Sequence, residues 1–130
     1  MSQVTSSRAP SAIGPYSQAV VADGWVFVSG QIPLDPVSGM LVEGDLSQQM
    51  TRVLENIGAI LTSAGSGFES VVKSTLYLTD MADFTTVNDV YARYFKPPYP
   101  ARATVGVASL PKGARVEMDV VARITCETSG

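Results

Sequence analysis

Histidine is absent from all 130 residues of this chain. Its absence excludes the Ser-His-Asp and Cys-His arrangements of nucleophilic catalysis, and it removes most zinc sites, so we expect no metal. Any acid–base chemistry must therefore use aspartate, glutamate, tyrosine, lysine or water.

Cysteine and long apolar runs are also scarce. The one cysteine, Cys126, cannot form a disulfide within the chain, which favours a cytoplasmic protein. No apolar run approaches the ~20 residues of a membrane-spanning helix. The polar start, MSQVTSSRAPS, lacks the apolar segment of a signal peptide. We therefore expect a cytoplasmic protein that has no membrane partner.

Clusters of basic residues are missing as well. Nine lysines and arginines face twelve aspartates and glutamates, which gives a net charge of −3. Proteins that bind phosphate backbones carry a basic patch or stripe, and none is visible here. We therefore expect no nucleic-acid partner.

The residues that are present predict one α+β domain over residues 1–130. Apolar residues make up 45% of the chain, enough for a core. Periodicity and turn signals predict the order β-β-α-β-α-β-β. The expected segments are an irregular arm at 1–15, strands at 17–21 and 25–31, a loop at 32–44, a helix from its N-cap Asp45 to near Gly65, a strand at 71–78, a second helix that KPPYP stops, strands at 101–107 and 114–124, and a tail at 125–130.

Two helices with apolar stripes can cover one face of such a sheet. In the strand at 71–78, Val72, Leu76 and Leu78 are expected on the covered face. The other face then carries Trp25, Phe27, Thr75, Tyr77 and Val121 with a few charges. This mixture is too apolar for water, and it predicts a subunit interface with a cleft between chains.

Arg102 and Glu117 are the charged candidates for a site, and both lie on the polar side of their strands. Arg102 is either a solvated surface arginine or a residue that binds a carboxylate with its planar fork. Glu117 is either an ion-pair partner of a nearby lysine or arginine (Lys73, Arg115 or Arg123) or a base that activates water, with a pKa raised by apolar neighbours.

Four uncharged candidates accompany them. The strand WVFVSGQ ends in Ser29 and Gly30, where glycine lets a ligand approach the backbone N–H and serine adds a hydroxyl. Tyr16 is either an edge aromatic or a side chain that closes over a small ligand. Asn88 is either a surface amide or a polar group of the site.

Five segments together resemble the Rid/YjgF family of enamine/imine deaminases, over residues 8–124: AIGPYSQAV, VFVSGQIP, VVKSTLYLTDMADFTTVNDVY, YPARATV and LPKGARVEMDVVA. The resemblance implies a chorismate mutase-like homotrimer with clefts between subunits. It also implies that the enzyme needs no cofactor. The reaction that the resemblance implies is hydrolysis of 2-aminoacrylate, 2-iminobutanoate and related acids, which pyridoxal-phosphate enzymes release, to 2-keto acids and ammonia.

The resemblance also assigns roles to residues. It makes Arg102 the residue that binds the substrate carboxylate and Glu117 the acid that orients water. Many members carry a cysteine where this chain has Thr104, which puts thiol-based activity in doubt. The remaining substrate-binding positions fall on Tyr16, Ser29, Gly30 and Asn88.

Three other functions stay open at this point. One is deamination of a different unsaturated amino acid such as 2-aminomuconate. Another is the endoribonuclease activity described for some relatives, against which the acidic charge and the missing histidine argue. The third is a chaperone-like or ligand-binding trimer without turnover.

Overall fold

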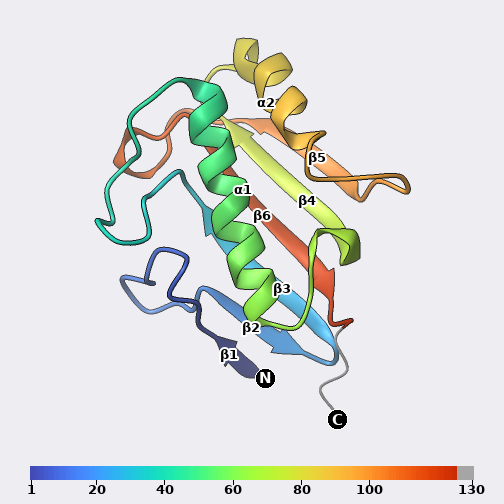
Figure 1. Cartoon of the computed structure of the whole chain (residues 1–130). Coiled ribbons are helices and arrows are strands. Elements are labelled where there is room, and N and C mark those ends of the chain that lie inside the picture. Colours follow the sequence, from blue (N-terminus) through green and yellow to red (C-terminus); the bar gives the residue numbers. More distant parts are fainter. Residues whose placement is uncertain (126–130) are drawn as a thin grey trace.

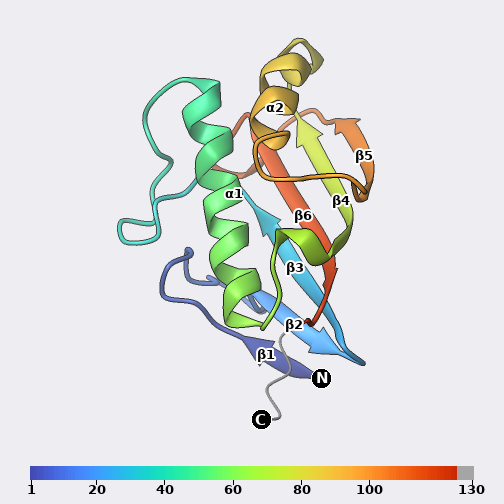
Figure 2. The same ribbon diagram turned by 45° about the vertical axis from the view of Figure 1, so that its right-hand side comes forward.

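A computed structural model describes residues 1–125 of the chain. Six strands form one sheet in the order β1-β2-β3-β6-β4-β5, and two helices lie on the same face of it (Figures 1 and 2). This is the α+β class that the sequence predicts. The strands are β1 (Ser2–Val4), β2 (Ala19–Ala22), β3 (Trp25–Gln31), β4 (Val71–Leu78), β5 (Ala101–Gly106) and β6 (Val116–Arg123), and the helices are α1 (Leu46–Ser63) and α2 (Phe84–Tyr91).

Helix α1 forms where its pattern predicts it. Asp45 accepts a hydrogen bond from the Gln48 backbone N–H, and the Gln48 side chain accepts one from the Asp45 backbone N–H, which together make a capping box. The helix packs on β3, β6 and α2. Its inner face supplies much of the core, with Met50, Val53, Leu54, Ile57, Ile60 and Leu61 fully buried.

The first fifteen residues differ from the irregular arm that was expected. Residues 2–4 form β1, which pairs with β2 in antiparallel register. Gln18 holds the following residues, because its amide nitrogen donates to the Ser6, Ala9 and Pro10 carbonyls and its oxygen accepts from the Ser6 N–H. A strand of three residues is too short to show an alternating pattern, so its pairing is decided by β2.

The predicted alternation of strand β4 is wrong at Val72. Val71 is buried and Val72 is 38% exposed, the reverse of what was expected for Val72. The register against β6 shifts between Val71 and Lys73, so the strand is bulged at its start. A bulge adds one residue and exchanges the two faces, which a sequence pattern does not reveal.

The two faces of the sheet differ as predicted in their apolar content. Trp25, Phe27 and Val105 lie on the helix-free face and are 37%, 46% and 41% exposed. They lie on β3 and β5, and the same face also carries Glu117 and Asp119 of β6 between them; we call it the helix-free face below. Within residues 1–125, no helix has the length and apolar character needed to cross a bilayer.

Candidate active site

Arg102 lies on the edge strand β5, on the side of the sheet that the helices cover. It pairs in register with Ser74 of β4, whose side chain is fully buried on that side. Its Nη1 donates to the Asn88 Oδ1 at 2.8 Å, and its guanidinium carbon lies 4.8 Å from the ring centroid of Tyr91. Helix α2 supplies both Asn88 and Tyr91, so the crossover from β4 to β5 orients this arginine.

A cavity of about 440 Å³ opens beside this guanidinium, and we call it the Arg102 cavity. Its walls are mostly apolar, and in residues 1–125 no carboxylate forms an ion pair with Arg102. A cation that is oriented but unneutralised is suited to bind an anionic ligand. The lining residues are Asn88, Tyr91, Ala92, Tyr99, Pro100 and Arg102.

Glu117 lies on β6, directly opposite Tyr77 of β4, on the helix-free face. Burial raises the pKa of Glu117, and the negative charge of Asp119 on the same face raises it further. Asp119 is held in place by the Tyr77 hydroxyl, which donates to its Oδ2 at 2.9 Å. Burial is the main cause of this rise, which has the direction expected for a carboxylate near apolar side chains.

Gly30 makes the burial of Glu117 possible. Val28 pairs with Val120 and Gln31 with Met118, so Ser29 and Gly30 form a bulge in β3. A Cβ atom on Gly30 would lie 2.5 Å from the Oε2 of Glu117. The small residue at the end of this strand therefore leaves room for a carboxylate of the same chain.

A second cavity, of about 320 Å³, lies beside this carboxylate, and we call it the Glu117 cavity. Tyr16 contributes to its wall, and the Tyr16 hydroxyl accepts a hydrogen bond from the Ile13 N–H at 3.3 Å. Lys112 also lines this cavity, from a turn where its φ is +58°. A carboxylate with a raised pKa beside a space for a small molecule can act as a base towards bound water.

Ser29 and Thr104 occupy different positions from these groups. The Ser29 hydroxyl donates to the Ser17 carbonyl at 2.6 Å, and its side chain lines a shallow hollow next to Phe27. Thr104 follows Arg102 on the same side of β5, where it pairs with Leu76 and is half-buried.

Arg102 and Glu117 lie on opposite faces of the sheet, although both fall on the polar side of their strands. On β6 the apolar residues face the helices, so Glu117 points to the helix-free face. On the edge strand β5 the apolar residues Ala103 and Val105 face the helix-free side instead, so Arg102 points to the helices. One chain therefore brings Arg102 together with Asn88, and Glu117 together with Gly30 and Tyr16, but it does not join the two groups.

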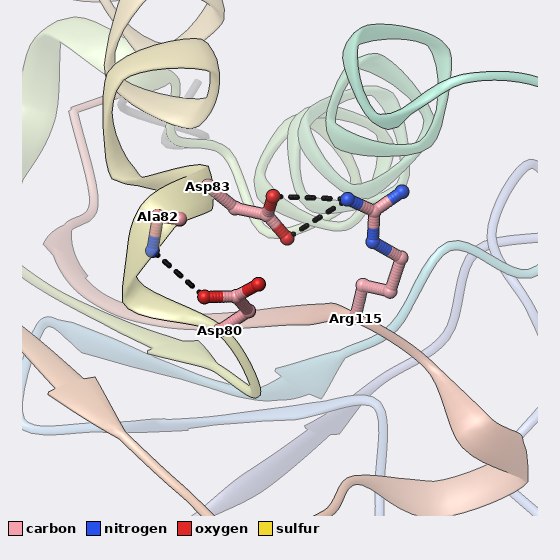
Figure 3. A network of polar contacts seen from close by, with 4 residues as sticks. All are labelled: Asp80, Ala82, Asp83 and Arg115. Carbon is pink, nitrogen blue, oxygen red and sulfur yellow. Dashed lines mark hydrogen bonds and ion pairs between the residues drawn. The ribbon is translucent and has the colours of Figure 1, made fainter.

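Glu117 forms no ion pair within the described part of the chain. Arg115 binds Asp83 instead, with its Nη2 at 2.9 and 3.0 Å from the two carboxylate oxygens, and Asp80 accepts from the Ala82 N–H nearby (Figure 3). Arg123 stacks over Trp25, with its guanidinium carbon 5.6 Å from the ring. The ion pair between Arg115 and Asp83 fastens the start of β6 to the residue that precedes α2.

Tyr91, Ser74 and Asp119 are site residues that the sequence analysis did not single out. Tyr91 lies in the second predicted helix, where its hydroxyl is the one sequence signal of a role beyond packing. Ser74 is a lone small polar residue in a strand, which has no specific signal. Cys126, the lone thiol, lies outside the described residues.

Comparisons with known proteins show what the chain as a whole is similar to. The family model described as Endoribonuclease L-PSP matches residues 6–124. A 2-iminobutanoate/2-iminopropanoate deaminase from Bos taurus is 51% identical over 119 residues, which are 92% of this chain and 87% of the relative.

Solved structures resemble the whole fold. A protein of unknown function from Yersinia pestis, assigned to the conserved Rid protein family, is 48% identical, with a TM-score of 0.92 over 95% of this chain and 98% of that one. TdcF from E. coli, solved with bound serine, is 39% identical, with a TM-score of 0.90 over 96% of this chain and 100% of that one.

Proposed function

The chain belongs to the Rid/YjgF family, whose sequence model is described as Endoribonuclease L-PSP, and we infer that it is a deaminase of 2-imino acids. The reaction is hydrolysis of 2-iminobutanoate, 2-iminopropanoate and their enamine tautomers to 2-keto acids and ammonia. The relative from Bos taurus carries the name of this activity at 51% identity.

The observation that carries this proposal is the environment of Arg102. Its guanidinium is oriented by the amide oxygen of Asn88 and by the Tyr91 ring, neither of which neutralises its charge. Four of the five N–H donors of an arginine remain for a ligand after one is given to Asn88. A 2-imino acid offers a carboxylate that fits this planar fork. The serine bound to TdcF also carries a carboxylate next to an amino-bearing carbon.

The complete site is shared between copies of the chain in this proposal. Arg102 lies on the edge strand, and Val105 is an exposed apolar residue of the helix-free face on that same strand. A second copy that packs on this face and reaches around the edge strand β5 can place its Glu117 opposite the Arg102 cavity. We assign this arrangement to a homotrimer with three equivalent clefts, because cyclic symmetry repeats one contact at each interface.

The reaction needs two groups in this scheme. Arg102 binds the substrate carboxylate, which fixes the position of the imine carbon. A water molecule bound to Glu117 attacks that carbon, and its proton passes to the carboxylate as the C–O bond forms. Glu117 then passes this proton to the nitrogen, which gives a carbinolamine. Glu117 next takes the proton of the new hydroxyl and transfers it to the nitrogen as the C=O bond forms and the C–N bond breaks, and ammonia leaves. Free imines already hydrolyse in water, so a general base worth about 10²–10⁴-fold together with positioning is sufficient.

The other predicted residues take secondary roles. Gly30 leaves its backbone N–H near the reacting atoms, and Tyr16 closes the Glu117 cavity. Thr104 lies two residues after Arg102 on the same side of β5, where it provides a small polar group. The Ser29 hydrogen is donated to Ser17, so its oxygen is left as an acceptor.

A coupled assay tests the function. An amino-acid oxidase generates the imine, and its loss is followed with and without this protein. We expect faster loss of the imines of small amino acids, and 2-aminomuconate is the comparison for a different substrate class. Binding of a keto acid without any acceleration would leave only a ligand-binding trimer. Light scattering tests the assembly, which should have about three times the 13.7 kDa chain mass.

The family description also names an endoribonuclease, so RNA cleavage is the alternative to test. The net charge of −3 and the lack of a basic cluster argue against it. Salt-sensitive cleavage of RNA that disappears in Arg102→Ala would favour it. The cellular role that we propose is removal of reactive imines in the cytoplasm. A lone cysteine that forms no internal disulfide fits that compartment, where thiols are kept reduced.

A further inference from the structure

Arg102 rests on aromatic rings. Its guanidinium carbon lies 4.8 Å from the ring centroid of Tyr91 and 5.5 Å from that of Phe84. Both rings come from α2, at its first and last residues. An arginine over a ring face is attracted by the negative face of the π-system, so these contacts limit where the guanidinium can lie.

The Tyr91 ring is itself held on two sides. Its hydroxyl and that of Ser74 share a hydrogen bond of 2.7 Å, and both residues are buried. Its ring stacks on Phe95, with centroids 4.3 Å apart and an interplanar angle of 21°. Ser74 is the residue directly beside Arg102 in the sheet, so the short serine side chain leaves room for the tyrosine to reach under the arginine.

Tyr91 orients the guanidinium without adding a charge. Burial raises the pKa of Tyr91, although the hydrogen bond to Ser74 and the charge of Arg102 act in the other direction. The side chain is therefore a neutral phenol at neutral pH. An aspartate or glutamate in this place would pair with Arg102 and compete with the carboxylate of a ligand.

We propose that Tyr91 is a positioning residue for substrate binding: its ring holds the guanidinium of Arg102 in the orientation that receives a carboxylate, and Ser74 fixes the ring. This inference rests on the proposed function, because it assumes that Arg102 binds the carboxylate of a 2-imino acid. Tyr91 acts through Arg102, and the chemical step belongs to other groups.

The test uses binding of 2-oxobutanoate, a stable keto acid, to the whole protein by calorimetry. Tyr91→Leu removes the ring face and should raise the Kd about two- to thirtyfold. Tyr91→Phe keeps the ring face and loses only the hydroxyl, so its Kd should stay within about threefold of the parent. Both variants lose the hydrogen bond to Ser74, so both should melt at a lower temperature than the parent, and Ser74→Ala should do the same. Only Tyr91→Leu should also bind 2-oxobutanoate more weakly, so a lower melting temperature alone does not explain weaker binding.

A matched pair of variants controls for the loss of an aromatic residue. Phe84 and Phe68 are both half-buried, and Phe84 contacts Arg102 whereas Phe68 packs on Phe95 and Tyr94. Phe84→Leu should raise the Kd of 2-oxobutanoate about two- to fivefold, and Phe68→Leu should leave it unchanged. This pair decides the question if Tyr91→Leu does not fold.

Two results would overturn the proposal. One is a Kd for Tyr91→Leu within about twofold of the parent. The other is an equal rise in Kd for Phe84→Leu and Phe68→Leu. A parent protein that neither binds 2-oxobutanoate nor hydrolyses imines would overturn the proposed function itself, and this inference with it. A parent that does both, with Tyr91→Leu unchanged, would overturn the inference alone.

Discussion

The surroundings of Arg102 and of Glu117 have opposite effects on the charged form of each side chain. Arg102 is oriented by an amide oxygen and aromatic rings, so its charge is left for a ligand. Glu117 lies half-buried near the like charge of Asp119, and its pKa is raised. In the proposed site the first region binds an anion, and the second holds a carboxylate with a raised pKa, which suits a base. The two regions face opposite sides of the sheet, so the proposed reaction needs a second copy of the chain to bring them together.

Loss of the Arg102 region should have the largest effect. Arg102→Ala removes a bidentate interaction with the substrate carboxylate, worth about 3–5 kcal/mol, so kcat/KM should fall about 10²–10⁴-fold. Arg102→Lys should recover little, because an ammonium lacks the planar fork. The exposed Arg93, two residues after the end of α2, provides the control, as Arg93→Ala. Activity of Arg102→Ala within about threefold of the parent would contradict the role of Arg102.

Loss of the Glu117 base should affect the chemical step more than binding. Glu117→Gln should lower kcat about 10²-fold or more, while 2-oxobutanoate still binds because Arg102 is intact. Stopped-flow or coupled kinetics together with calorimetry separate the two quantities. A parallel loss of binding would show that Glu117 also holds the substrate.

The same variant should not lose stability. Folding raises the pKa of Glu117, so its stabilising contribution is complete below the pKa of the unfolded chain and is lost as the pH rises through the folded pKa. Glutamine carries no charge at any pH. Glu117→Gln should therefore be at least as stable as the parent at pH 7, and the difference should close as the solution is acidified, as measured by urea unfolding.

Mixing the two inactive proteins tests whether the regions meet between chains. Random trimers of Arg102→Ala and Glu117→Gln copies contain intact Arg102 and intact Glu117 at about one quarter of the interfaces. Activity after co-refolding should recover to about that share of the parent. Homotrimers refolded separately and then combined are the control. No recovery would place both residues of a functional site in one chain.

A methyl group on Gly30 should disturb the Glu117 region by a smaller amount. The Cβ atom of Gly30→Ala would lie 2.5 Å from the Oε2 of Glu117, so the carboxylate must move. A displaced base should lower kcat about ten- to hundredfold. The Kd of 2-oxobutanoate should be unchanged. Gly106→Ala is the control, because its nearest atom is the Cγ of Met81 at 3.3 Å. Wild-type kcat in Gly30→Ala would mean that the position of Glu117 is unimportant.

The smallest expected change is a shift in pH dependence. Glu117 must be ionised to act as a base, and its raised pKa places the acid limb of kcat above the ordinary range of glutamate. Asp119→Asn removes a negative charge that contributes to this rise, so the acid limb should move to lower pH. Tyr77→Phe, which keeps the Asp119 charge, is the matched variant and should move it less. If the acid limb of kcat does not shift in Asp119→Asn, burial alone accounts for the raised pKa of Glu117.

The sequence predicted the elements better than the faces on which their side chains lie. The capping box at Asp45 and the 3–4 spacing from Leu46 to Leu61 act within one helix, so local pattern was sufficient for α1. Strand β1 and the bulges at Val71 and Gly30 depend on a neighbouring strand, and local pattern missed them or left them ambiguous. Strand polarity and local motifs indicated most candidate site residues, the family resemblance assigned their roles and added Thr104, and the environment of each came from the fold.

The sequence by itself determined the chemistry that is available and the side of each strand that is polar. Without histidine, the acid–base group had to be a carboxylate, a phenol or an amine, and alternation placed Arg102 and Glu117 on polar sides. Only the tertiary structure decided that these polar sides face in opposite directions, that Ser74 and Tyr91 lie beside Arg102, and that Gly30 accommodates Glu117. The physical reason is that alternation defines two sides within a strand, whereas strand order and pairing decide which side the helices cover.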